Sequence, residues 1–151
     1  TNFGLMALGA HVVQTGSVNA SALATSALVN ILVGLLLFLN EFPDADVDRK
    51  SGRRHVVALL GRRTSSRLYL VLLAITYVLL AGLVVIGALP AACLVALASA
   101  PLALRASRIV VTHYDDFTSI VPALGMNVLV VLLTIGLLSV GFVAAAFLYG
   151  R

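Results

Sequence analysis

Long apolar runs without a charged residue are the feature that most limits how this chain can fold. Three such runs, Ala20–Leu39, Leu68–Leu89 and Ala123–Tyr149, contain no Asp, Glu, Lys or Arg. A membrane-spanning helix needs roughly 20 apolar residues, because ~30 Å of hydrocarbon is crossed at ~1.5 Å per residue. The runs are continuous and do not alternate, so they predict helices and not the strands of a membrane barrel.

Two further segments complete the expected bundle. Phe3–Gln14 is a shorter apolar run, and Pro90–Leu104 can extend to Arg108 with a kink expected at Pro101. The chain is 61% hydrophobic and 11% charged, whereas soluble domains carry about 25% charged residues, which excludes a soluble globular domain. The single Cys93 also excludes a disulfide scaffold. We therefore expect an all-α fold, a multi-spanning transmembrane helix bundle of about five helices.

The charged residues gather in two loops. Eleven of the sixteen lie between Glu41 and Arg67, and seven of those eleven are basic. A second charged loop covers residues 105–122, whereas the connections 16–19 and 88–89 carry no charge. Basic loops stay on the cytoplasmic side, so we expect a multi-pass protein of the plasma membrane with loops 41–67 and 105–122 in the cytoplasm. Membrane topology and contacts with lipid headgroups account for most of the basic residues, and nucleic-acid binding is not expected.

An acidic stripe follows the second apolar run. Asn40, Asp44 and Asp48 are four residues apart, so on a helix they project from nearly one face. Two carboxylates and an amide oxygen form a hard-oxygen site that suits Mg²⁺. Asp46 points off this stripe. Pro43 removes a helical hydrogen bond, so we expect a kink between Asn40 and Asp44, with a fresh helical turn that starts at Pro43.

Basic residues come directly after the carboxylates. Lys50, Arg53 and Arg54 are placed so that a bound diphosphate can have a metal ion on some oxygens and cationic side chains on others. The alternative interpretation is that the acidic and basic side chains simply pair with one another at a wet surface, where such pairs contribute little.

These residues also carry a resemblance to a known family. The run resembles the second aspartate-rich motif of the UbiA-type intramembrane prenyltransferases, most closely that of the 1,4-dihydroxy-2-naphthoate branch and its archaeal relatives. Segments 9–16 and 113–116 resemble the corresponding parts of that branch. The motif reads Asn40-x-x-x-Asp44-x-x-x-Asp48-Arg49-Lys50-x-Gly52-Arg53-Arg54-His55, ending in Leu59-Leu60-Gly61.

The resemblance implies a particular architecture. Such enzymes have nine transmembrane helices and two aspartate-rich motifs that face one another across a central cavity. Residues 1–151 resemble the second half of that single transmembrane domain, and the first motif has no counterpart here. We therefore expect that the N-terminal half of the same protein is missing and that this fragment alone is inactive.

The resemblance also implies a reaction and a set of site residues. The reaction is Mg²⁺-dependent transfer of a prenyl group from a prenyl diphosphate to an aromatic acceptor of the 1,4-dihydroxy-2-naphthoate kind, within the lipid bilayer, for quinone (menaquinone) biosynthesis. Asp44 and Asp48 are the implied catalytic residues, and Asn40 joins them as a metal ligand. The implied diphosphate-binding residues are Lys50, Arg53, Arg54 and Tyr114.

Several alternatives stay open at this point. Within the family the acceptor can instead be 4-hydroxybenzoate, a chlorin, haem or a glycerol-lipid phosphate. A CDP-alcohol phosphotransferase would need an Asp-Gly and an Ala-Arg pair upstream of Asp44, which the sequence lacks. A non-catalytic transport or assembly subunit would place charged residues within the helices, yet every charged residue before Arg151 lies in the two loops.

Polar residues outside the motif have two interpretations each. Tyr114 and Asp115 can close over the motif or belong to an ordinary loop. Asn127 can line the cavity or bond to a neighbouring helix, and for Asn30 we expect such an inter-helix bond. His11 is expected near the uncharged end of the bundle, away from the chemistry.

Overall fold

The chain folds into helices in the computed structural model, which describes residues 3–53 and 55–149, apart from the side chains of Phe3, Asp48 and Tyr149. Within these residues there is no strand. The elements in order are α1 (Phe3–Thr15), α2 (Ala20–Lys50), α3 (Val56–Leu60), α4 (Arg62–Val85), the 3₁₀ helix η1 (Ala91–Ser99), α5 (Ala100–Thr112) and α6 (Phe117–Tyr149).

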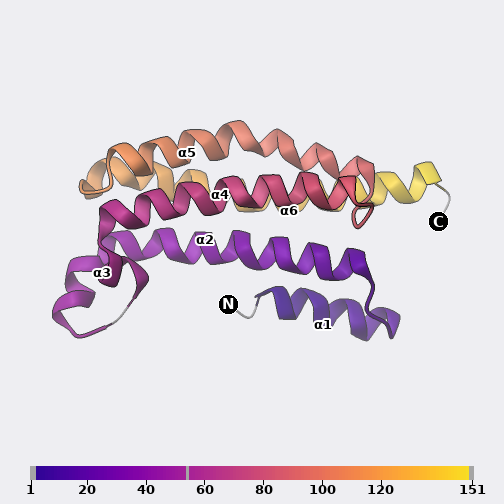
Figure 1. Cartoon of the computed structure of the whole chain (residues 1–151), viewed down its shortest axis with the longest axis horizontal. Coiled ribbons are helices and arrows are strands. Elements are labelled where there is room, and N and C mark those ends of the chain that lie inside the picture. Colours follow the sequence, from indigo (N-terminus) through magenta and orange to yellow (C-terminus); the bar gives the residue numbers. More distant parts are fainter. Residues whose placement is uncertain (1–2, 54, 150–151) are drawn as a thin grey trace.

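The long helices lie side by side along the long axis of the molecule (Figure 1). Four segments are long and apolar enough to cross a membrane, namely residues 20–47, 62–85, 91–112 and 117–148. The shorter α1 lies along only one half of α2 and leaves its other half uncovered on that side (Figure 1). The predicted multi-spanning helical bundle is confirmed. It consists of these four segments and the shorter helix α1.

Both prolines lie within helical segments. Pro43 is inside α2, which is helical from Ala20 to Lys50, so no new helix starts at this residue. Pro101 lies where the segment changes from a 3₁₀ helix to an α-helix. It lies in the first turn of α5, just after η1 ends at Ser99, where the missing N–H of proline has no helical acceptor to lose.

The helices approach one another closely at two glycines. A Cβ atom at Gly141 of α6 would lie 2.7 Å from Cα of Cys93 in η1, so the two backbones touch there. The backbone N–H of Gly4 in α1 donates to Oδ1 of Asn30 in α2 at 3.4 Å. Small residues allow such approaches between membrane helices, and the polar bond adds to the packing. The inter-helix bond expected for Asn30 is thereby confirmed.

Hydroxyl and amide groups join the helices in the core. Tyr77 of α4, Ser99 of η1 and Thr134 of α6 form a hydroxyl cluster, in which Oγ of Ser99 lies 2.8 Å from both other oxygens. Asn127 accepts a 2.8 Å hydrogen bond from Tyr69 and donates to the Leu35 carbonyl at 3.4 Å. Of the two interpretations of Asn127, lining a cavity or bonding to a neighbouring helix, the structure supports the second.

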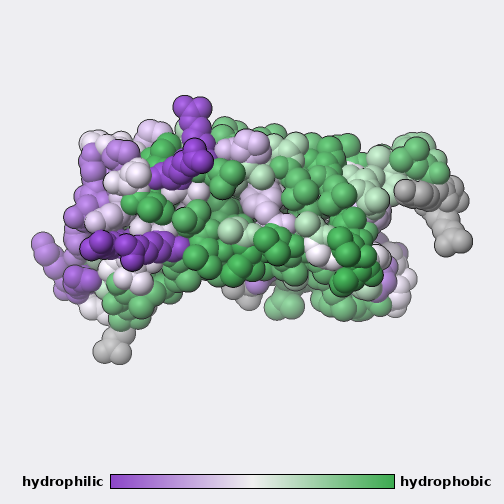
Figure 2. Space-filling view, turned by 45° about the horizontal axis from the view of Figure 1, so that its top comes forward, coloured by the Kyte–Doolittle hydropathy of each residue, from purple (hydrophilic) through white to green (hydrophobic). Residues whose placement is uncertain are grey.

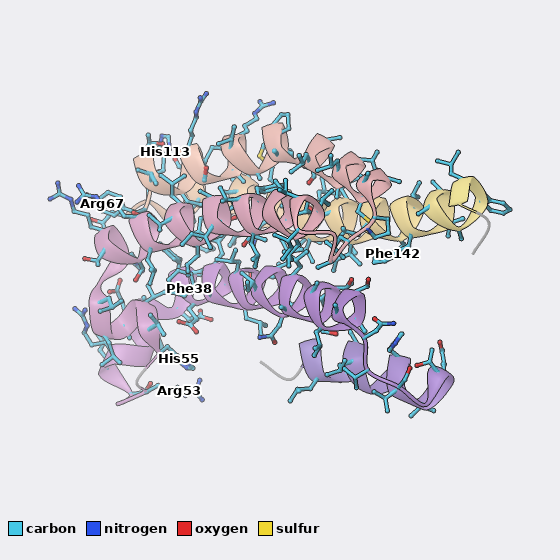
Figure 3. All side chains as sticks on the ribbon, turned by 45° about the vertical axis from the view of Figure 1, so that its right-hand side comes forward. Phe38, Arg53, His55, Arg67, His113 and Phe142 are labelled. Atoms are coloured by element: carbon cyan, nitrogen blue, oxygen red, sulfur yellow. The ribbon has the colours of Figure 1, made fainter. Side chains whose placement is uncertain are left out.

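The two charged loops lie at the same end of the bundle. Hydrophilic residues gather at the end that carries α3, and hydrophobic residues cover most of the remaining length (Figure 2). Arg53, His55, Arg67 and His113 lie at this end, whereas Phe142 lies towards the other (Figure 3). We call it the charged end. This arrangement confirms the prediction that the charged loops 41–67 and 105–122 lie on the same side of the bundle.

Candidate functional site

The acidic stripe lies on the last turns of α2, at the charged end. Asn40 and Asp44 are both exposed, whereas Phe42 and Ala45 on another face of the same turns are buried. The buried side chains continue the helical spacing of Leu28, Leu32, Leu35 and Leu39 in the apolar run. This continuation packs one face of α2 against the bundle and leaves the stripe pointing outward.

Part of the predicted site lies outside the described residues. Asp48 belongs to α2, one turn beyond Asp44, but its side chain is not among those described, and neither is Arg54. Lys50 is exposed at the end of α2, and Arg53 is exposed in the turn that follows. Gly52 makes this turn with a φ of 75°, a backbone conformation that favours glycine.

The segment that follows Gly52, which contains α3, folds back onto α2. Oε2 of Glu41 accepts a 3.3 Å hydrogen bond from the Val57 N–H, and its Oε1 lies 3.8 Å from Nδ1 of His55. The guanidinium group of Arg49 donates to the Ala58 carbonyl at 3.0 and 3.3 Å. Glu41 and Arg49 thus fix α3 to α2. The sequence gives little signal for this role, because most of the acceptors and donors on α3 are backbone atoms.

A second set of contacts centres on Arg62, the first residue of α4. Its Nη1 lies 3.0 Å from Oδ2 of Asp46 and 3.6 Å from Oδ1 of Asp115, and its Nε donates to the Phe42 carbonyl at 3.2 Å. From its place in the basic loop 41–67, Arg62 was expected only to help set membrane topology and contact lipid headgroups. The surrounding pocket of about 290 Å³ is lined by Ala45, Asp46, Arg49, Leu60, Gly61, Arg62, Arg63, Tyr114 and Asp115.

Tyr114 and Asp115 therefore lie on a different side of α2 from the stripe. Asp46 is two residues beyond Asp44, which corresponds to about 200° around a helix, so the two carboxylates point nearly opposite ways. Tyr114 and Asp115 line the pocket on the Asp46 side. The structure brings Tyr114 near the motif-bearing helix but does not bring it over Asn40 and Asp44.

The donor chemistry of the stripe fits a hard divalent cation. Among the described residues, no group of three or more His, Cys, Asp and Glu side chains is placed to hold a metal ion. Asn40 and Asp44 offer one amide oxygen and one carboxylate, both exposed. Mg²⁺ usually keeps several waters and shares its coordination with substrate phosphates, so a few protein oxygens on an accessible face suit it.

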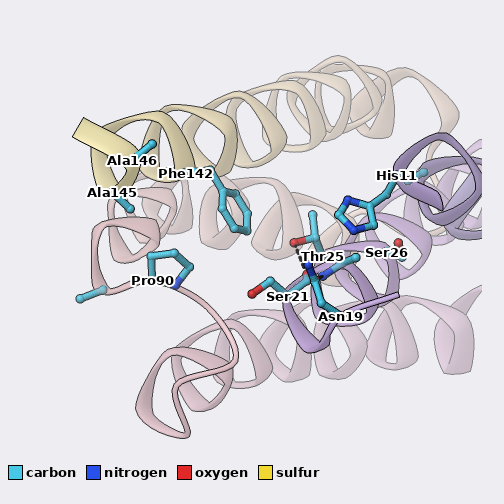
Figure 4. A pocket seen from close by; sticks show the side chains of 12 residues that line it. His11, Asn19, Ser21, Thr25, Ser26, Pro90, Phe142, Ala145 and Ala146 are labelled. Carbon is cyan, nitrogen blue, oxygen red and sulfur yellow. Dashed lines mark hydrogen bonds between the residues drawn. The ribbon is translucent and has the colours of Figure 1, made fainter. Parts of the chain in front are cut away.

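A cavity of about 1110 Å³ lies at the other end of the bundle. It is bounded by α1, α2, the start of η1 and α6, and includes His11, Thr25 and Phe142 (Figure 4). Among the described residues, no Asp, Glu, Lys or Arg lines it, so it offers little to a diphosphate. The expected position of His11, near the uncharged end, is confirmed.

Comparisons with known proteins agree with the resemblance. The model of the UbiA prenyltransferase family matches residues 1–119. A relative from Bacillus subtilis (strain 168), 1,4-dihydroxy-2-naphthoate octaprenyltransferase, is 32% identical over 76 residues, which cover 50% of this chain and 24% of that enzyme. No solved structure matches. Because the family match includes the stripe, the Arg62 contacts and most of the bundle, the chain belongs to the UbiA prenyltransferase family.

Proposed function

We propose that this protein transfers a prenyl group from a prenyl diphosphate to an aromatic acceptor within the membrane. The observation that carries the proposal is the exposed pair Asn40 and Asp44 at the charged end of a bundle of this family. Asn40, Asp44 and Asp48 would hold Mg²⁺. The bound ion supplies positive charge that favours departure of the diphosphate.

The chain's own cations support the same step. Lys50 and Arg53 are exposed just beyond the stripe, and with Arg54 they would donate charge-assisted hydrogen bonds to the diphosphate oxygens. As the allylic C–O bond breaks, negative charge grows on the diphosphate, and fixed cations stabilise it. A ring carbon of the acceptor then bonds to the allylic cation and afterwards loses its proton. The apolar helices would hold the isoprenoid tail and exclude water.

We propose 1,4-dihydroxy-2-naphthoate as the acceptor, in menaquinone biosynthesis, because the Bacillus relative carries that substrate in its name. The site would face the cytoplasm of a plasma-membrane protein, since the basic residues gather at this end. The first aspartate-rich motif of the family, expected in the N-terminal half, would face the exposed stripe and complete the charge needed for a diphosphate.

The test measures prenyl transfer by the complete gene product in membranes, with Mg²⁺ and a prenyl diphosphate, to 1,4-dihydroxy-2-naphthoate and to 4-hydroxybenzoate. Asp44→Asn and Asp48→Asn are each expected to abolish transfer while the protein stays folded. Asp116→Asn makes the same chemical change at the same end of the bundle and is expected to keep activity.

Three outcomes would contradict parts of the proposal. Turnover like that of the wild type in Asp44→Asn would contradict the assignment of Asp44 as a metal ligand. Transfer to 4-hydroxybenzoate alone would replace the acceptor. Undiminished transfer after EDTA treatment would contradict the proposed dependence on Mg²⁺.

A further inference from the structure

Arg62 connects three segments of the protein through one side chain. It begins α4, directly after Gly61, and its side chain is only 21% exposed. Its guanidinium group contacts the Phe42 carbonyl and the Asp46 carboxylate on α2, and the Asp115 carboxylate in the loop before α6. A planar guanidinium holds several acceptors in fixed directions, which an ammonium group does not do.

The two contacts on α2 bracket Asp44. Phe42 and Asp46 are four residues apart, so they lie one above the other on one face of the helix, and Asp44 lies midway between them on the opposite face. A rotation of this turn about the helix axis would lengthen at least one of the two contacts. Arg62 thereby fixes the direction in which Asp44 points.

These contacts are better suited to orientation than to stability. The carboxylate side chains of Asp46 and Asp115 are 66% and 81% exposed, and exposed ion pairs contribute little to the free energy of unfolding. The contact with the Phe42 carbonyl acts on the backbone of the turn itself. Removing Arg62 would therefore loosen the turn more than it would unfold the bundle.

We propose that Arg62 is a positioning residue, which sets the metal-binding turn of α2 from the face opposite the metal. The inference rests on the proposed function, since it assigns Arg62 a role through Asp44. Residues that orient metal ligands from outside the coordination sphere typically change metal affinity by about 10- to 100-fold when they are replaced.

The test measures Mn²⁺ binding by electron paramagnetic resonance, in the presence of inorganic diphosphate, on the complete gene product in detergent. Arg62→Gln is expected to raise the Kd for Mn²⁺ by about 10- to 100-fold, and Arg62→Lys is expected to give a smaller rise in the same direction. Arg67→Gln is the matched control, because Arg67 is an exposed arginine on the same helix, and its Kd is expected to stay within about twofold of the wild type.

A second variant tests the same contacts from the other side. Asp46→Asn combined with Asp115→Asn leaves Arg62 in place and removes both ionic partners, so it is expected to weaken Mn²⁺ binding as well. This double variant provides the test if Arg62→Gln does not fold. A folded variant with a lowered melting temperature and an unchanged Kd would show a purely structural role and overturn the proposal.

The failure of the proposed function gives a different result. Asp44→Asn should remove Mn²⁺ binding if the stripe is the metal site. Retained binding in Asp44→Asn means that the metal site itself is wrongly assigned. Lost binding in Asp44→Asn, with wild-type binding in the Arg62 variants, means that only the positioning role is wrong.

Discussion

The hydroxyl group of Tyr69 donates a 2.8 Å hydrogen bond to Oδ1 of Asn127, and both side chains are buried. The amide of Asn127 also donates to the Leu35 carbonyl at 3.4 Å. One buried amide thus joins α4, α6 and α2. Tyr69 belongs to the same core cluster as Leu35 and Phe42, so this network supports the part of α2 that leads to the acidic stripe.

Tyr69→Phe is expected to destabilise the protein by about 1 kcal/mol, because it leaves the buried Asn127 oxygen without its donor, and hydrogen bonds between membrane helices contribute on this scale. The free energy of unfolding in detergent micelles measures the change. A double-mutant cycle with Asn127→Leu separates the pair from each residue's other contacts. Additive effects of the two substitutions would mean that this hydrogen bond contributes nothing.

The sequence predicted the helices and the charged end, because both follow from local composition. Apolar runs of spanning length fold into helices in lipid whatever their neighbours are. The continuation of α2 beyond the apolar run, on which the acidic stripe depends, also has a local signal. Phe42 and Ala45 continue the spacing of Leu35 and Leu39, and all four are buried.

The contacts around the candidate site were harder to predict. Arg62 reaches the Phe42 carbonyl, 20 residues earlier, and Asp115, which lies in another loop. No spacing rule links such positions, since the link depends on how α2, α4 and α5 pack. Tyr114 was expected in a loop at the charged end. That expectation did not specify the side of α2 on which Tyr114 lies, because this side also depends on how the helices pack.

Gly141→Ala is expected to destabilise the bundle by about 1–3 kcal/mol, the usual cost of overpacking. The new Cβ would lie 2.7 Å from Cα of Cys93 and 2.9 Å from the Ala92 carbonyl oxygen, so α6 must move away from η1. Thermal unfolding in detergent tests this.

Gly136→Ala is the matched control on α6. Gly136 is exposed, and no heavy atom outside its own helical surroundings lies within 4 Å of the position of its Cβ. Since alanine favours a helix interior, this substitution is expected to stabilise the protein by up to about 1 kcal/mol. Equal effects of the two substitutions would argue against the close contact at Gly141.

Asp116 caps the first turn of α6 and gives the protein a pH-dependent contribution to stability. Its carboxylate accepts hydrogen bonds from the Ser119 hydroxyl and from the hydroxyl and N–H groups of Thr118. These bonds hold the pKa of Asp116 below its usual value. The contribution is therefore complete above the ordinary carboxyl pKa of about 3.9 and is lost as the pH falls through the lowered pKa.

Asp116→Ala is accordingly expected to lower the melting temperature at pH 6, with a difference from the wild type that shrinks below about pH 4. Melting curves of both proteins between pH 6 and pH 2.5 would check this, and these bounds bracket the carboxyl titration at about pH 3.9. Asp116→Asn keeps a capping oxygen but does not titrate, so its capping contribution should not change with pH. A constant difference for Asp116→Ala would contradict the lowered pKa.

Gly61 joins α3 to α4 with a backbone conformation that only glycine adopts readily. Its φ is 78° and its ψ is 154°, a region that costs other residues about 1–3 kcal/mol. Its N–H donates to the Val57 carbonyl at 2.9 Å, and its carbonyl accepts from the Ser65 N–H at 3.0 Å. Gly61→Ala would strain this junction and shift Arg62, the next residue, away from its partners.

We therefore expect Gly61→Ala to lower the free energy of unfolding by about 1–3 kcal/mol and also to weaken Mn²⁺ binding in the presence of inorganic diphosphate. Gly82→Ala in α4 is the control, because no heavy atom outside its own helical surroundings lies within 4 Å of the position of its Cβ, and alanine favours the helix interior. Unchanged stability in Gly61→Ala would contradict the backbone argument. Reduced stability with unchanged Mn²⁺ affinity would separate the junction from the metal-binding turn, because the strain would then stop short of the contacts between Arg62 and α2.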